Sequence, residues 1–170
     1  MNHQSVEHNY QILVTKIHRL FKEAGKKRAV VELSGEADSF VLLCLAVDTL
    51  GKECVHGLMM PSPFSTVHSV TDSVKLAEQV DISYHIIPID SIYHKFLKEL
   101  TPTFGNSASE ITRNHLQAHI RSALLMAYAN QKECILLDTT LITSEGMEET
   151  QVYELIKLIN KETIRIPLWR

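Results

Sequence analysis

The sequence predicts an α/β fold in which a doubly wound parallel sheet carries helices on both faces. Four short apolar segments alternate along the chain with longer segments whose apolar residues recur at helical spacing. The connections between successive apolar segments are too long for hairpins, so consecutive strands are expected to run parallel. A length of 170 residues with 45% hydrophobic side chains suits a single domain over residues 1–170.

Local signals place the ends of the expected elements. Gly25 follows the first helical segment, since glycine adopts the left-handed conformation that closes a helix. Asp90 or Ser91 can cap the fourth helix. Thr112 can cap a long helix that follows a polar loop at 101–111. Strands are expected at 29–33, 55–60, 84–89 and 134–137, and helices at 6–24, 39–51, 69–79, 92–100, 112–130 and 149–160.

Composition excludes several classes of protein. The formal net charge is -3, and the short basic run 26–28 does not indicate a nucleic-acid partner. None of the three cysteines has CxxC spacing, and Cys44 and Cys134 lie in apolar runs, where cysteine packs as a small core residue. No apolar run reaches membrane-spanning length, and the first residues are polar. The sequence therefore predicts a soluble cytoplasmic domain with no membrane and no nucleic-acid partner.

The turn after the first strand, SGEADS at 34–39, has the character of an anion site. A junction from strand to helix gathers free backbone N–H groups at the positive end of a helix dipole. Ser34 and Ser39 add hydroxyl donors, and Gly35 allows close approach of a ligand to the backbone. Asp38 could hold Mg²⁺ against a phosphate, or it could serve only as a helix cap. Chemistry alone leaves a nucleotide site and an ordinary capped turn both open.

Several segments together carry a family resemblance. SGEADS resembles the SGGxDS pyrophosphate loop of the N-type ATP pyrophosphatases. The segments 45–80, 114–130 and 150–160 resemble the NAD synthetases, especially their synthetase domain. Residues 139–145 resemble the TTGNKSE motif of that family. The resemblance runs in order along nearly the whole chain, and it implies an adenine nucleotide alpha hydrolase-like fold, a Rossmann-like three-layer sandwich.

The resemblance also implies a chemistry. NAD synthetases use ATP and Mg²⁺ to adenylate the carboxyl of nicotinic acid adenine dinucleotide, and ammonia then displaces AMP. Because charge develops on phosphoryl oxygens, amide donors and a metal ion matter more than an acid–base pair, and no side chain is singled out as catalytic. The family forms homodimers through the helix at 112–130. The implied ligand-binding positions are Ser34, Gly35 and Ser39 for pyrophosphate, Asp38 and Glu145 for the metal, Met60, Pro61 and Ser62 for adenine, and Arg121 for the dinucleotide substrate.

Some of these residues could instead have a purely structural role. Met60 can be a core residue, and Arg121 can be a solvated helix charge or part of an ion pair between subunits. His115 and His119 lie four residues apart, a spacing that can bind zinc, but no third ligand is evident nearby.

The sequence departs from the family where ligand is contacted. Glu36 replaces the second glycine of SGGxDS, which adds a carboxylate and puts a β-carbon where the backbone can require a positive φ. Residues 141–143 read Leu-Ile-Thr where the family has Gly-Asn-Lys. Only residues 146–149 link Glu145 to the TQVYEL segment, so the substrate-clamp loop of the family is expected to be absent, as is its C-terminal tail.

Three functions follow from this pattern of retained packing and altered ligand contacts. The first is an ammonia-using NAD synthetase with a minimal site that is impaired or inactive in catalysis. The second is a non-catalytic homodimer or interaction protein on the same fold, which can still bind a nucleotide. The third is an ATP pyrophosphatase that acts on another substrate. Glu36 is either neutralised by Mg²⁺ or by geometry, or permitted because the turn no longer holds pyrophosphate.

Overall fold

A parallel sheet forms the centre of the molecule. The structure is a computed structural model that describes residues 3–105, 108–161, 163, 165 and 166. Four strands lie in the order β3-β2-β1-β4, and every neighbouring pair is parallel. The strands are β1 (Ala29–Glu32), β2 (Val55–Met59), β3 (Ser83–Ile86) and β4 (Ile135–Leu137). The predicted fold class is confirmed.

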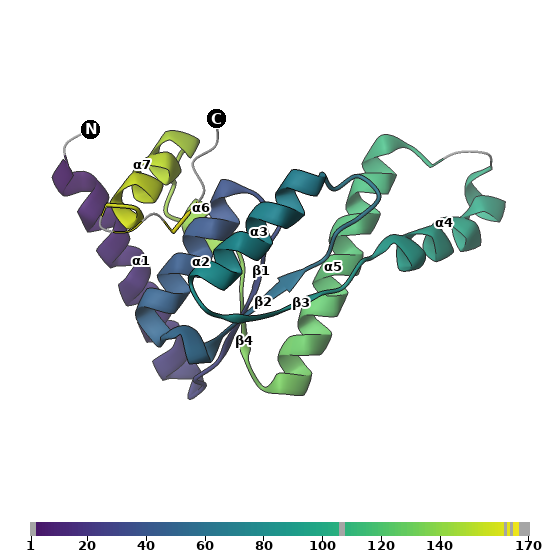
Figure 1. The fold of residues 1–170 in the computed structure, drawn as a ribbon. Coiled ribbons are helices and arrows are strands. Elements are labelled where there is room, and N and C mark those ends of the chain that lie inside the picture. Colours follow the sequence, from purple (N-terminus) through teal and green to yellow (C-terminus); the bar gives the residue numbers. More distant parts are fainter. Residues whose placement is uncertain (1–2, 106–107, 162, 164, 167–170) are drawn as a thin grey trace.

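Helices cover both faces of this sheet (Figure 1). One face packs against α1 (His3–Ala24), α2 (Ala37–Leu50), α3 (Val67–Gln79) and α7 (Glu149–Ile159). The other face packs against α4 (Asp90–Phe104) and α5 (Glu110–Lys132). Two short elements complete the described chain, the 3-10 helix η1 (Lys52–Cys54) and the single turn α6 (Thr140–Thr143). Within the described ranges, no helix combines the length and the apolar character needed to cross a membrane.

Strand β1 is apolar over residues 29–31 because both of its faces are buried. Ala29 and Val31 belong to the core on the α2 side, whereas Val30 belongs to the core on the α5 side. Successive side chains of a strand point to opposite faces, so a strand buried on both faces is apolar throughout. Helix α2 is buried along its first two turns, with residues 39–46 all inaccessible, because it lies between the sheet and helices α1 and α7.

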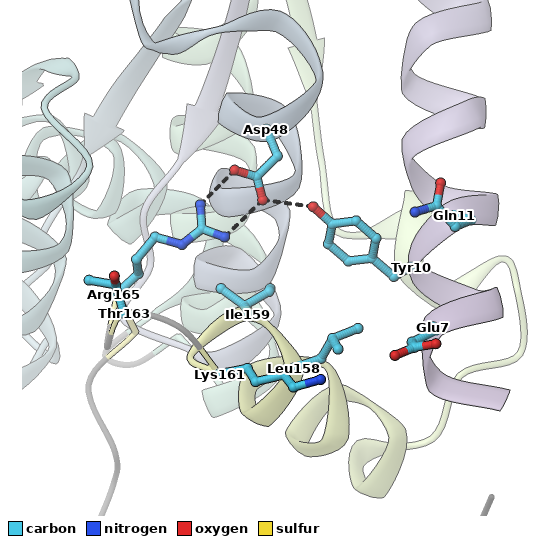
Figure 2. A pocket seen from close by; sticks show the side chains of 9 residues that line it. All are labelled: Glu7, Tyr10, Gln11, Asp48, Leu158, Ile159, Lys161, Thr163 and Arg165. Atoms are coloured by element: carbon cyan, nitrogen blue, oxygen red, sulfur yellow. Dashed lines mark hydrogen bonds and ion pairs between the residues drawn. The ribbon is translucent and has the colours of Figure 1, made fainter. Parts of the chain in front are cut away.

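Three side chains far apart in sequence form a polar cluster (Figure 2). They are Tyr10, Asp48 and Arg165, and we call this cluster the Asp48 clasp. The Asp48 carboxylate of α2 accepts two hydrogen bonds from the Arg165 guanidinium, at 2.6 and 2.9 Å. It also accepts one from the Tyr10 hydroxyl of α1 at 2.7 Å. Burial and the hydrogen bond to Asp48 raise the pKa of Tyr10 far above its usual range. The clasp lines an open cavity of about 720 Å³ beside α7 and ties the segment after α7 back to α2.

Some predicted boundaries were wrong. The loop expected at 101–111 is largely helical, because α4 runs through Pro102 to Phe104 and α5 begins at Glu110. Thr112 does not cap α5; its backbone N–H donates instead to the side chain of Ser109, which is the cap. The segment expected as a strand at 84–89 is a regular strand only over Ser83–Ile86, although the backbone N–H groups of Ile87 and Ile89 still donate to the Met59 and Pro61 carbonyls. Asp90 is the first residue of α4 and makes no cap hydrogen bond.

Candidate functional site

The loop between β1 and α2 is closed by its own hydroxyl groups. The buried Ser39 hydroxyl donates to the Glu36 carbonyl at 2.8 Å. The Ser34 hydroxyl donates to Ser39 Oγ at 3.2 Å and accepts from the Glu36 N–H at 3.3 Å. The two serines expected to hold pyrophosphate therefore lie together in one hydrogen-bonded loop at the carboxyl end of β1. Ser34 stays exposed to solvent, so its oxygen remains reachable by a ligand.

Gly35 is required by both conformation and space. Its φ is +91°, in the region that disfavours a β-carbon. A β-carbon built there would also lie 2.4 Å from Cβ of Ser69, at the start of α3. The glycine therefore lets the first turn of α3 approach the loop directly.

Glu36 does not carry the backbone cost that its position suggested. Its φ of -93° and ψ of 154° are ordinary extended values that any residue adopts. It lies immediately before the first residue of α2, its side chain is exposed, and it makes no cap hydrogen bond. Replacing glycine by Glu36 was expected to strain the backbone and to add a negative charge. Only the negative charge applies.

Asp38 lies in the first turn of α2 and is half-buried. Burial raises the pKa of its carboxyl, and the nearby Glu149 carboxylate at the start of α7 raises it further. Helix α7 thus brings a second carboxylate towards the loop. Because the residue that precedes α2 is Glu36, Asp38 interacts with the helix dipole from inside the first turn and is not the cap.

Glu145, the other predicted metal ligand, forms an ion pair with Lys16 of α1. The acidic neighbour that acts on Asp38 is Glu149 instead. In the part of the chain that the structure describes, no group of three or more His, Cys, Asp or Glu side chains is arranged to hold a metal. His115 and His119 therefore gain no third ligand there. The assignment of Asp38 and Glu145 to a metal stays a prediction.

A small cavity lies beside the loop, where β1 and β2 end. Arg121 reaches across it from α5: its Nε donates to the Met60 carbonyl at 3.1 Å and lies 3.7 Å from Glu32 Oε1. The cavity has a volume of about 20 Å³, roughly the room for one water molecule. Ser34 and Pro61 also line it, so the structure brings four predicted ligand positions together: Ser34, Met60, Pro61 and Arg121.

The positions predicted to line an adenine pocket have different environments. Met60 is only 3% exposed and belongs to the core on the α5 side, so it is a core residue as well as a cavity wall. Ser62 is not part of that wall; its backbone N–H donates to Ser65 Oγ at 2.9 Å in the following turn.

Glu32 was missed by sequence reasoning. Burial raises the pKa of its carboxyl, while the Arg121 guanidinium opposes that rise. One feature of the sequence does point to Glu32: it is a carboxylate at the end of an otherwise apolar, buried strand. An ionised group in such a place needs a partner. That partner is Arg121, which the sequence placed in the substrate region without its acceptor.

Comparison with known proteins decides the family. A model of the NAD synthase family matches residues 9–148. The chain belongs to this family. A glutamine-dependent NAD(+) synthetase of Synechocystis is 33% identical over 95% of the chain, and an NH(3)-dependent NAD(+) synthetase of Halobacterium salinarum is 33% identical over 68% of it. The chain spans 32% and 42% of those two relatives, respectively.

Solved NAD synthetase structures share the fold. The glutamine-dependent enzyme of Acinetobacter baumannii, in complex with ADP, superposes with a TM-score of 0.86 at 31% identity, covering 94% of this chain and 34% of that one. The NH3-dependent enzyme of Campylobacter jejuni gives a TM-score of 0.78 at 23% identity, covering 97% of this chain and 77% of that one. The predicted Rossmann-like fold and family resemblance are therefore both confirmed for this NAD synthase family member.

Proposed function

We propose that this chain is a NAD synthetase-like domain whose capacity for ATP-dependent amidation of nicotinic acid adenine dinucleotide is impaired. The observation that carries the proposal is the cavity at the ends of β1 and β2. Glu32 and Arg121 meet across it and leave a volume of about 20 Å³. Small-molecule sites are usually about 300–1,000 Å³, so a nucleotide base needs Arg121 to move first.

Moving Arg121 has a defined cost. Its guanidinium would give up the bond to the Met60 carbonyl and leave Glu32 without its cationic neighbour. Separating a partly buried carboxylate from its cationic partner is unfavourable, because burial disfavours the ionised form and Arg121 offsets that effect. A nucleotide must therefore break these interactions of Arg121 before it can form contacts of its own in the cavity.

The carboxylate of Glu36 adds a second obstacle. A charge about 4 Å from a phosphate charge repels it by roughly 4 kcal/mol at an effective dielectric constant near 20. The exposed side chain can turn outward and lower that repulsion, since nothing in the described structure holds it by a cap hydrogen bond. Glu36 is therefore expected to weaken binding and not to abolish it alone.

The residue types at the predicted ATP and Mg²⁺ positions nevertheless suit those ligands. The Ser34 and Ser39 hydroxyl groups can donate to pyrophosphate, but each must first leave its partner within the loop. Ser69 fills the space beside Gly35. Mg²⁺ is commonly held by one or two carboxylates together with substrate phosphates, and Asp38 supplies a hard oxygen ligand at the loop. Glu145 could join it only after leaving Lys16. When bound, Mg²⁺ would neutralise charge on the phosphoryl oxygens.

Calorimetric titration with Mg-ATP tests the proposal on four chains: wild type, Glu36→Gly, Glu32→Gly and the double variant. We expect no micromolar binding by wild type and the largest gain in the double variant. A matched control is Glu99→Gly, which removes an exposed carboxylate on α4 that does not line the cavity. Micromolar binding by wild type, followed by steady formation of NAD from the deamido precursor and ammonia, would contradict impairment.

A second function, that of a homodimeric interaction module, is favoured by the outer surface of α5. Ala118, Ala123, Met126 and Ala127 are exposed on this helix, and Met126 is 57% accessible. Phe96 and Phe104 of the adjoining α4 are also about half exposed. Exposed apolar groups of this kind are typical of a contact between subunits. We infer a homodimer through α5, which can persist whether or not nucleotide binds.

A further inference from the structure

A second cavity lies at the opposite end of the sheet from the nucleotide loop. It has a volume of about 320 Å³ and opens at the amino ends of β2 and β3, beneath the last turns of α5. Nothing in the proposed function uses it. Its polar lining includes Arg28, His56, Ser83, His85, Tyr128 and Lys132.

Two histidines and a serine form a continuous hydrogen-bonded row in this cavity. His56 and Ser83 are register partners on β2 and β3, and His56 Nδ1 lies 2.8 Å from Ser83 Oγ. His56 Nε2 lies 2.7 Å from Nδ1 of His85, so one proton is shared between the two rings. The Tyr128 ring stacks on His56 with centroids 4.9 Å apart and planes 15° from parallel, which fixes the orientation of the imidazole.

When the two histidines together carry one positive charge, a single arrangement of protons gives each ring nitrogen a hydrogen-bond role. His56 donates through Nδ1 to Ser83, one proton lies between His56 Nε2 and His85 Nδ1, and the Nε2–H group of His85 points outward. A bound anion at His85 Nε2 favours that charged arrangement. Without an anion, burial, the adjacent His85 and Lys132 lower the pKa of His56 to about 4.

The permanent charges around the row are mainly positive. Arg28 precedes β1, and Lys132 ends α5. Among the described residues neither forms an ion pair, and Glu53 is the one carboxylate in the lining. Tyr128, Cys54 and Cys134 complete the titratable groups there. An anion entering this cavity therefore meets two unpaired cations and a histidine row that can add a further charge.

We propose that this cavity is a binding site for a small phosphate-bearing anion, held by Arg28, Lys132 and the outward nitrogen of His85. A phosphate dianion offers several acceptor oxygens to the guanidinium fork and to the ammonium group. The volume suits a small phosphorylated molecule and is near the lower end for ligand sites. This site is independent of nucleotide binding at the other end of the sheet.

The test is a titration of the folded chain with inorganic phosphate, observed through the ring-carbon NMR signals of His56 and His85. Sodium chloride at matched ionic strength is the control for screening. We expect a saturable shift of both rings with phosphate only, and a rise in the pKa of His56 above its value of about 4 in the free chain. Lys132→Ala should weaken phosphate binding about tenfold, the equivalent of one charge-assisted contact.

Two further variants locate the site. Lys98→Ala, at an exposed position on α4, and Ser34→Ala, in the loop after β1, should both leave the phosphate response of the His56 and His85 rings unchanged. The proposal is wrong if the ring signals fail to saturate, if chloride reproduces the shift, or if Lys132→Ala binds as wild type does. Loss of binding in Ser34→Ala would also overturn it, by placing the phosphate in the loop after β1.

Discussion

Gly35 sets the geometry of the loop at the level of a single residue. Gly35→Ala is expected to lower the free energy of unfolding by about 2–4 kcal/mol, because a strained φ adds to a β-carbon overlap with Ser69. Gly25→Ala is the matched control: its φ is +63°, but nothing lies within 4 Å of the added carbon. It should cost only about 1–2 kcal/mol. Urea denaturation measures both, and equal losses would show that the contact with Ser69 is unimportant.

Glu32 makes stability depend on pH in a predictable direction. Because the pKa of Glu32 is raised on folding, the folded state binds its proton more tightly than the unfolded state. The stabilising contribution is complete below the ordinary value of 4.5 and is lost as pH rises through the folded pKa. Glu32→Gln removes this titration. Relative to the variant, wild type should therefore lose stability as pH rises from about 4.5 through the folded pKa of Glu32.

Denaturation of the two proteins across that range checks the sign. Glu53→Gln serves as the control, since it makes the same change at an exposed carboxylate away from Arg121. A difference between wild type and Glu32→Gln that stays constant with pH would mean that Arg121 fully offsets the burial of the carboxylate.

At the scale of elements, the Asp48 clasp joins α1, α2 and the segment after α7 (Figure 2). Both partners of its ion pair are 25% exposed, so its strength lies between that of a surface pair and that of a buried one. A double-mutant cycle of Asp48→Ala and Arg165→Ala is expected to give a coupling energy of about 1–2 kcal/mol. Tyr10→Phe, which removes only the hydroxyl, should cost about 1 kcal/mol.

Urea titrations give the free energy of unfolding of wild type, of the two single variants and of the double variant. Arg19→Ala combined with Glu23→Ala is a matched comparison, because that pair lies exposed along α1. Its coupling should be smaller than that of the clasp, because solvent screens both exposed side chains. A clasp coupling no larger than this would mean that the segment after α7 is held by its apolar contacts alone.

Periodicity predicted most elements because burial and helical spacing are local properties of the sequence. The four strands and six main helices were all found, whereas α6 was missed because a single turn has too few residues to show a period. Helix α4 is longer than the predicted 92–100, because the polar segment that contains Pro102 continues the helix to Phe104. The pairing of Glu32 with Arg121 could not be predicted, since it depends on how α5 crosses the sheet.

Across the whole molecule, the exposed face of α5 predicts association in solution. Light scattering after gel filtration is expected to give twice the chain mass of 19.3 kDa. Met126→Glu should shift the protein towards the monomer, because a carboxylate would be buried without a partner in the contact. Lys98→Glu on α4 changes charge at an exposed polar position and should leave the dimer intact. A monomeric wild type would contradict this assembly.

The order of the strands has a consequence for synthesis of the chain. β1 lies at the centre of the sheet, but one of its two partners, β4, follows about 100 residues later, as does α7, which packs on α1 and α2. At about 5–20 residues per second, a ribosome needs roughly 5–20 s to reach them. Throughout that interval one edge of β1 and the part of α2 that contacts α7 have no partner within the nascent chain. Slow translation of the region between β2 and β4 would therefore favour aggregation over folding, since an unpaired strand edge pairs readily with other chains.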